Sequence, residues 1–170
     1  ASRILGIKCI CHLQDLITPR YNGILISIFN KILHINSAFI ICDGVTIFDN
    51  LTKSLKLRSS IILNGINFYD YRRSDKLGLK YREKLKIPED AYVIGNLSRI
   101  TPWKGQLEIL LPFIQYSKQN PNAYLLLAGS PLFDRSDYLD SIKEKVVKYN
   151  ISKKVIMPGF ENDIKSFFSS

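Results

Sequence analysis

Histidines, cysteines and paired acidic residues are scarce in this chain. It has two histidines, His12 and His34, and three cysteines, Cys9, Cys11 and Cys42. The cysteines are odd in number and lack the CxxC spacing, and no Asp-x-Asp pair occurs. This pattern argues against a zinc site, a carboxylate-bound metal and a disulfide framework. We therefore expect buried free thiols in a reducing compartment, and a site that needs neither metal nor cofactor.

Uncharged apolar runs long enough to cross a bilayer are also missing. The most apolar stretch, residues 24–48, is interrupted by Asn30, Lys31, His34, Asn36 and Asp43. A spanning helix needs about 20 apolar residues, so we expect none. The first residues lack the ordered charged, apolar and small-residue zones of a signal peptide. We interpret both ends, at Ala1 and Ser170, as cuts, and we expect a cytoplasmic protein.

Basic residues outnumber acidic ones. The chain has 24 Lys and Arg against 15 Asp and Glu, a formal net charge of +9. A positive surface favours anionic partners such as nucleotide phosphates, anionic lipid or nucleic acid. The alternative is a solvated basic surface without a specific partner. We expect no nucleic-acid partner, because neither a recognised binding motif nor an aromatic-basic platform is present.

Apolar stretches alternate with helical patterns along the chain. We expect strands at 4–13, 38–42, 60–63, 92–97, 123–128 and 155–157. We expect helices at 19–35, 45–55, 80–85, 106–118, 137–149 and from 163 onward. Pro112 should kink or delay the helix that contains it. Strands that alternate with helices predict an α/β fold with Rossmann-like parallel sheets.

A polar segment divides this pattern into parts of two domains. Residues 67–90 are rich in Tyr, Arg, Lys and Asp, and they follow the Asn64-Gly65 turn. We predict one Rossmann-like part at 1–66, a crossing between domains at 67–90, and a second Rossmann-like part at 91–170.

The helix expected at 19–35 has two interpretations. Its apolar residues, with Arg20 and Lys31, could contact a membrane surface. They are too numerous for a solvated face, which favours a buried core helix.

The stretch from Gly95 to Gln106 carries the clearest chemistry. It joins a strand to a helix through a turn that holds Arg99 and Lys104, five positions apart. Free N–H groups at a helix start attract anions, Arg grips phosphate oxygens in pairs, and Lys adds a point charge. We predict a diphosphate site in which Gly95 leaves room for backbone approach and Ser98 donates to a phosphate or caps the turn. The alternative is a pair of surface cations near a turn.

Four segments resemble the GT-B glycosyltransferases, most closely glycosyltransferase family 4. In chain order they are IILNGI at 61–66, GNLSRITPWKGQ at 95–106, NPNAYLLLAG at 120–129 and VIMPGF at 155–160. Their order and spacing fit the family, and the resemblance covers nearly the whole chain. It implies parts of two domains of a GT-B architecture. Residues 1–66 would lie on the acceptor side, and residues 91–170 would bind a nucleotide sugar.

The resemblance also implies roles for single residues. Arg99 and Lys104 would neutralise the donor diphosphate and stabilise charge on the leaving phosphate, a catalytic role. Two strand ends would border the nucleotide, and their residues are Gly129, Ser130, Gly159 and Phe160. Ordinary strand-to-loop glycines would explain the same pattern equally well. For Trp103 we expect core packing.

His12 and Asp15 are the candidates in the first part of the chain. The family often carries a His-x-His-Asp run near the transferred sugar, and here the run is His12-Leu13-Gln14-Asp15. Gln14 stands where some members have the second histidine, so this chain departs from the pattern. We predict that His12 and Asp15 line the acceptor cleft and that His12 is a catalytic candidate. A hydrogen-bonded structural histidine is the alternative.

The resemblance implies a metal-independent, retaining glycosyltransferase. It would move a sugar from a nucleotide-sugar donor, a substrate and not a cofactor, to a glycan or lipid-linked acceptor. For its localisation we expect the cytoplasm, with peripheral contact at the inner face of the membrane as the other option. The family's two glutamates, seven residues apart, are absent from this sequence. This stretch alone is therefore expected to be inactive. The alternative is a non-catalytic nucleotide-binding or partner-binding module on the same fold.

Overall fold

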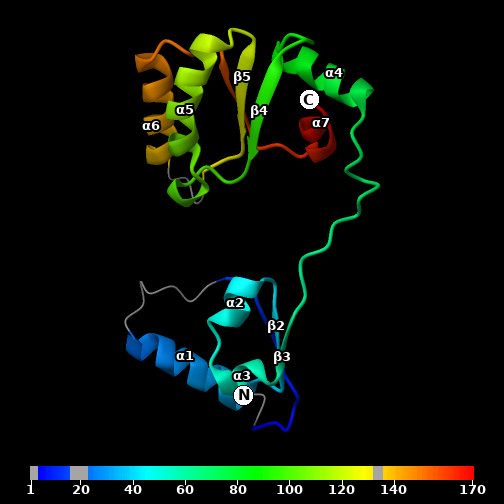
Figure 1. Ribbon diagram of the computed structural model, residues 1–170, viewed down its shortest axis with the longest axis vertical. Helices are drawn as coiled ribbons and strands as arrows, with labels where there is room; N and C mark the ends of the chain where they lie inside the picture. The colour runs from blue at the N-terminus through cyan, green and yellow to red at the C-terminus, as the bar shows by residue number, and fades with distance from the viewer. Residues whose placement is uncertain (1–3, 16–22, 132–135) are drawn as a thin grey trace. The chain divides into compact units, whose positions relative to one another are not determined.

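A computed structural model describes residues 4–15, 23–131 and 136–170 (Figure 1). The chain divides into two compact units, Ala1–Ile66 and Asn67–Ser170. Each unit is built on a parallel three-stranded sheet, in the order β1-β2-β3 in the first and β4-β5-β6 in the second. The predicted α/β class with two parallel sheets is therefore confirmed.

The first unit alternates short strands with helices. Its elements are β1 (Ile10–Leu13), α1 (Gly23–Asn36), β2 (Phe39–Cys42), α2 (Val45–Asp49), α3 (Lys53–Lys56) and β3 (Ser59–Ile61). The buried residues that pack together are Leu13, Leu33, Ile40, Cys42, Ile47, Leu51 and Leu55. They come from the three helices, the connection between α2 and α3, the end of β1 and alternate positions of β2, so one face of the sheet carries this core.

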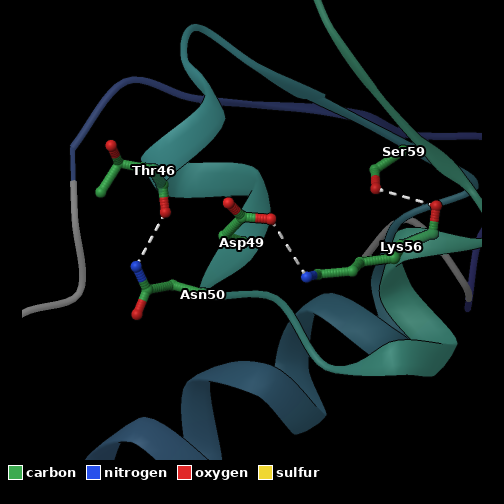
Figure 2. Close-up of polar contacts among 5 residues, drawn as sticks. All are labelled: Thr46, Asp49, Asn50, Lys56 and Ser59. Carbon is green, nitrogen blue, oxygen red and sulfur yellow. Dashed lines mark hydrogen bonds and ion pairs between the residues drawn. The ribbon is translucent and has the colours of Figure 1, made fainter.

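Polar contacts fix the two short helices, which replace the single helix expected at 45–55 (Figure 2). The Asn50 side-chain amide donates to the Thr46 carbonyl at 2.7 Å, at the end of α2. Lys56 Nζ lies 3.4 Å from Asp49 Oδ1, and Ser59 Oγ donates to the Lys56 carbonyl at 3.2 Å. The exposed ion pair contributes little, roughly 0–1 kcal/mol. The Ser59 contact joins the end of α3 to β3.

Several expectations for the first unit are wrong. The first strand begins at Ile10 and not at Ile4, because residues 4–6 form a turn in which Gly6 has φ +66°. Cys9 and Cys11 are only partly buried; Cys42 is buried, and all three thiols are free. Burial raises the pKa of Cys11 and Cys42.

Helix α1 is not the buried core helix that was preferred. Leu33 is its buried residue, whereas Ile24 is 69% exposed and Ile28 is 49% exposed. Arg20 and the first residues of the expected helix lie outside the described residues. In the part of the chain that the structure describes, no helix is both long and apolar enough to cross a membrane.

The second unit has helices on both faces of its sheet (Figure 1). Its elements are α4 (Asp75–Leu85), β4 (Tyr92–Leu97), η1 (Pro102–Lys104), α5 (Gln106–Gln119), β5 (Ala123–Ala128), α6 (Asp137–Lys148), β6 (Val155–Gly159) and α7 (Ile164–Ser169). Helices α5 and α6 cover one face, and α4 and α7 cover the other. The central strand β5 is almost wholly buried, because both of its faces are covered.

Helices α5 and α4 differ from what the sequence predicted. Helix α5 begins at Gln106 and runs through Pro112 to Gln119, so the expected delay is wrong. Residues 75–85 of the predicted crossing segment form α4, which packs on α7 within the second unit. The contact is close: a Cβ on Gly78 would lie 2.0 Å from the Ser169 carbonyl oxygen.

Candidate functional site

The carboxyl ends of β4, β5 and β6 meet at one edge of the second sheet. Leu97 pairs with Ala128, and Ala128 pairs with Gly159. Beyond the strands, Ser98 N donates to the Ala128 carbonyl at 3.0 Å, and Gly129 N donates to the Gly159 carbonyl at 2.8 Å. This edge is where open parallel α/β sheets bind ligands.

Gly129 lets two of these strand ends approach each other. Its φ is +142°, and a Cβ there would lie 1.8 Å from the Ser98 carbonyl oxygen. The close approach of the Ser98 carbonyl therefore requires a glycine at position 129. At Gly95 the neighbouring space is filled by protein, because a Cβ would meet the Phe167 ring at 3.0 Å.

Arg99 and Lys104 lie in the loop between β4 and α5, and both are exposed. The loop backbone is well fixed: Ile100 N donates to the Ser130 carbonyl at 2.9 Å, and Lys104 N donates to the Thr101 carbonyl at 3.0 Å. Neither cationic side chain forms a hydrogen bond or ion pair with any residue that the structure describes. The loop therefore presents two positive charges that no described acidic group neutralises.

Two aromatic residues at this edge are exposed. Trp103, in η1, is 67% exposed, and Phe160, directly after β6, is 71% exposed. The expected core packing of Trp103 is therefore wrong. Its turn is closed by Gly105, which has φ +74° and caps α5.

A hydroxyl group occupies part of the helix start that the sequence suggested as a free anion site. Leu107 N, in the first turn of α5, donates to Tyr138 Oη at 3.0 Å. Burial raises the pKa of the Tyr138 phenol, so the hydroxyl stays neutral. Phosphate binding at this edge would therefore depend on the loop cations more than on that N–H group. Nothing local in the sequence pointed to Tyr138, which is 31 residues away.

A network of side-chain hydrogen bonds connects β4, the loop after it and the first residue of α5. The Gln106 side chain is fully buried, and its Nε2 donates to Ser98 Oγ at 3.0 Å and to the Arg99 carbonyl at 2.9 Å. Ser98 Oγ in turn donates to Asn96 Oδ1 at 2.8 Å. The Ser98 hydroxyl, predicted to face a phosphate or to cap the turn, thus has its proton committed within the protein.

Glu161 anchors the loop that follows Gly159 and Phe160. Tyr81 Oη, on α4, donates to Glu161 Oε2 at 2.6 Å, and Asp163 N donates to Glu161 Oε1 at 2.8 Å. The hydrogen bond from Tyr81 lowers the pKa of Glu161, while burial and this carboxylate raise the pKa of Tyr81. Sequence reasoning missed this contact, because 80 residues separate the partners.

His12 and Asp15 belong to the first unit, and both are exposed. His12 pairs with Ile41 in the sheet, one position before the buried Leu13, so it lies on the sheet face opposite to the core. Among the described residues, no group of three His, Cys, Asp or Glu side chains is arranged to hold a metal ion.

Comparison with known protein sequences gives a family. Residues 79–170 match the model of glycosyl transferases group 1. An uncharacterized glycosyltransferase of Methanocaldococcus jannaschii is 26% identical over 123 residues, 71% of this chain and 28% of that protein. The lipopolysaccharide 1,2-N-acetylglucosaminetransferase of Salmonella typhimurium is 34% identical over 88 residues, 52% of this chain and 23% of that protein. The chain thus spans about a quarter of the length of these relatives.

Solved structures share the fold. The crystal structure of Anabaena HepE in complex with UDP and glucose matches with a TM-score of 0.86 and 21% identity, over 99% of this chain and 46% of that chain. A glycosyltransferase from Rickettsia africae matches with a TM-score of 0.70 and 17% identity, over 99% and 50% of the two chains. The predicted resemblance to GT-B glycosyltransferases is confirmed, and the chain belongs to the glycosyl transferases group 1 family.

Proposed function

We propose that this chain is part of a glycosyltransferase and that its second unit holds the diphosphate of a nucleotide-sugar donor. The observation that carries the proposal is the pair of exposed, unneutralised cations, Arg99 and Lys104, on a fixed loop at the carboxyl edge of a parallel sheet. A donor diphosphate carries two negative charges beside the bond that breaks. The two side chains supply matching charge without a metal ion.

The same pair would also accelerate transfer. As the bond between sugar and diphosphate breaks, negative charge grows on the leaving phosphate. Cations that are already in place stabilise that state more than the ground state, and this difference lowers the barrier. Among the described residues we identify no side chain suited to act as a covalent nucleophile. The retention that the family resemblance implies would then proceed without a covalent intermediate: the acceptor attacks from the face that the diphosphate leaves, assisted by the leaving phosphate.

The remaining parts of the proposal concern the other substrate. His12 and Asp15 would line the acceptor cleft, with His12 near the transferred sugar. The acceptor would be a glycan or a lipid-linked glycan, used at the inner face of a membrane to build a polysaccharide.

The edge of the second sheet that binds the donor would include Gly129, Ser130, Gly159 and Phe160. The exposed Phe160 ring, beside the anchored Glu161 loop, would contact the nucleotide base.

Binding of UDP-glucose tests the proposal. This probe is chosen because HepE, which shares the fold, has been crystallised with it. Titration calorimetry on the 170-residue chain should show binding, and Arg99→Ala and Lys104→Ala should each weaken it by about 10-fold, or 1.4 kcal/mol. Lys118→Ala, which removes an exposed cation at the far end of α5, should leave the affinity unchanged.

The outcomes separate the alternatives. The proposal fails if the unaltered chain does not bind UDP-glucose, or if both site variants bind it as tightly as the unaltered chain does. In the complete protein, Lys104→Ala should lower turnover roughly 100-fold or more, because charge stabilisation of this kind is worth that much in other enzymes. UDP-glucose binding without any sugar transfer by the complete protein would instead indicate a non-catalytic nucleotide-binding module.

A further inference from the structure

Gln106 is polar, yet it is fully buried at the point where α5 follows the loop that carries Arg99. Its side chain is 0% exposed at the first position of α5. Glutamine is mostly found at protein surfaces, so its burial needs a compensating role. Its Nε2 atom lies 2.9 Å from the Arg99 carbonyl oxygen and 3.0 Å from Ser98 Oγ, both in the loop, and 3.5 Å from Asn96 Oδ1 in β4. The side chain therefore ties the helix start to the backbone of Arg99.

The chemistry of the contacts fixes which way the Gln106 amide points. The Arg99 carbonyl is an acceptor only, so the atom 2.9 Å from it must be the donor nitrogen. The reverse orientation would place two carbonyl oxygens against each other. In the observed orientation Gln106 Oε1 is buried without a partner among the described residues. An unpaired buried acceptor costs about 1–3 kcal/mol, so the donor contacts have to outweigh that cost.

Ser98 extends this hydrogen-bonded network from Gln106 to Asn96 in β4. Ser98 Oγ accepts from Gln106 and donates to Asn96 Oδ1 at 2.8 Å. One hydrogen-bonded chain therefore links β4, the loop and the first turn of α5. The sheet edge holds the same loop from the other side, because Ser98 N and Ile100 N donate to the Ala128 and Ser130 carbonyls. The backbone of Arg99 is thus fixed before any ligand arrives.

We propose that Gln106 is a positioning residue for diphosphate recognition. It holds the Arg99 backbone so that the guanidinium group is presented at the sheet edge without a loss of loop entropy on binding. This inference rests on the proposed function of Arg99. Gln106 does not touch the donor; it acts through Arg99.

A double-mutant cycle tests the inference. The chains are the unaltered protein, Arg99→Ala, Gln106→Leu and the double variant, each titrated with UDP-glucose. Gln106→Leu should weaken binding by about 10-fold, yet by less than about 2-fold when Arg99 is already alanine, because residues that act as one unit are not additive. Uridine, which lacks the diphosphate, should bind Gln106→Leu and the unaltered chain equally. Gln115→Leu, at an exposed position of α5, is the matched control.

The results distinguish the two proposals. If the unaltered chain does not bind UDP-glucose, or if Arg99→Ala has no effect, the proposed function fails. If Arg99→Ala weakens binding but Gln106→Leu does not, this inference fails alone. It also fails if the two losses add, or if uridine binding falls together with UDP-glucose binding, since both would indicate a general structural role.

Gln106→Glu is a second variant that keeps the shape of the side chain. Burial raises the pKa of a carboxyl group, so the acid form persists at about pH 5.5 and can donate one hydrogen bond to the Arg99 carbonyl. Its affinity loss relative to the unaltered chain should shrink at that pH and grow at about pH 8, where the carboxylate cannot donate. The phosphates of UDP-glucose stay ionised throughout. A loss of affinity that does not depend on pH contradicts the proposed role of the hydrogen bond from residue 106 to the Arg99 carbonyl.

Discussion

Hydrogen bonds between residues far apart in the sequence hold the loops at the carboxyl edge of the second sheet in place. Tyr81 and Glu161 join α4 to the loop after β6, and Tyr138 joins α6 to the start of α5. Each contact involves a phenol that is at least partly buried. A buried donor or acceptor that loses its partner costs more than the bond itself contributes, so these contacts are worth testing singly.

Tyr81→Phe should destabilise the second unit in a pH-dependent manner. The hydrogen bond lowers the pKa of Glu161 in the folded state. Its contribution is therefore present above the unfolded pKa, about 4.3, and is lost as the pH falls through the folded pKa. Denaturant unfolding should show a loss of about 1–2 kcal/mol at neutral pH and a smaller loss at about pH 3. Tyr116→Phe, at an exposed position of α5, is the control. An equal loss at both pH values would contradict this account.

The sequence predicts Arg99 and Lys104 as site residues because their signal is local: both lie in one turn between a strand and a helix. Their role in binding stays a prediction. The sequence did not identify the partners of Gln106, Tyr81 or Tyr138, because those contacts are set by tertiary packing. The error at Trp103 has a related cause. A large aromatic side chain is usually buried, but the turn at 102–105 directs this one outward.

Helices and strands of the second unit were predicted closely because their periodicity is strong. The bounds of β4 and β5 are those expected from the sequence, and α5 differs by one residue at its end. Elements of the first unit were predicted less well. Periodicity reveals that α1 has an apolar face, but it cannot reveal what covers that face. The same limit explains why the expected strand at 4–13 begins at Ile10: a Gly6 turn overrides an apolar run.

The packing of α4 on α7 depends on Gly78. A Cβ at this position would lie 2.0 Å from the Ser169 carbonyl oxygen, which is backbone and cannot move aside cheaply. Gly78→Ala should therefore separate the two helices, although alanine is the better helix former by about 1 kcal/mol. We expect a net destabilisation of about 1–3 kcal/mol. Lys80→Ala, on an exposed position of the same helix, should be nearly neutral.

Thermal unfolding followed by circular dichroism checks this expectation. A rise in stability for Gly78→Ala would mean that helix propensity outweighs the close contact, and that α4 and α7 do not pack as tightly as the structure indicates. Because Tyr81 lies on α4, Gly78→Ala should also weaken the anchor on Glu161 and lower the affinity for UDP-glucose.

At the scale of the whole chain, each unit has its own core. The first is built around Ile40 and Leu55, and the second around Leu125 and Leu126, all of them 0% exposed. A unit with its own core can unfold as one cooperative body, so we expect a separate unfolding transition for each unit.

Matched leucine truncations test that separation. Leu55→Ala and Leu125→Ala each remove a fully buried side chain, so each should cost about 2–5 kcal/mol. Amide hydrogen exchange should show faster opening in residues 23–66 for the first variant and in residues 67–170 for the second. Saturating UDP-glucose should slow exchange only in residues 67–170, because a ligand stabilises the unit that binds it. If either truncation accelerates exchange equally in both units, the chain unfolds as one body, and donor binding would then depend on the first unit as well.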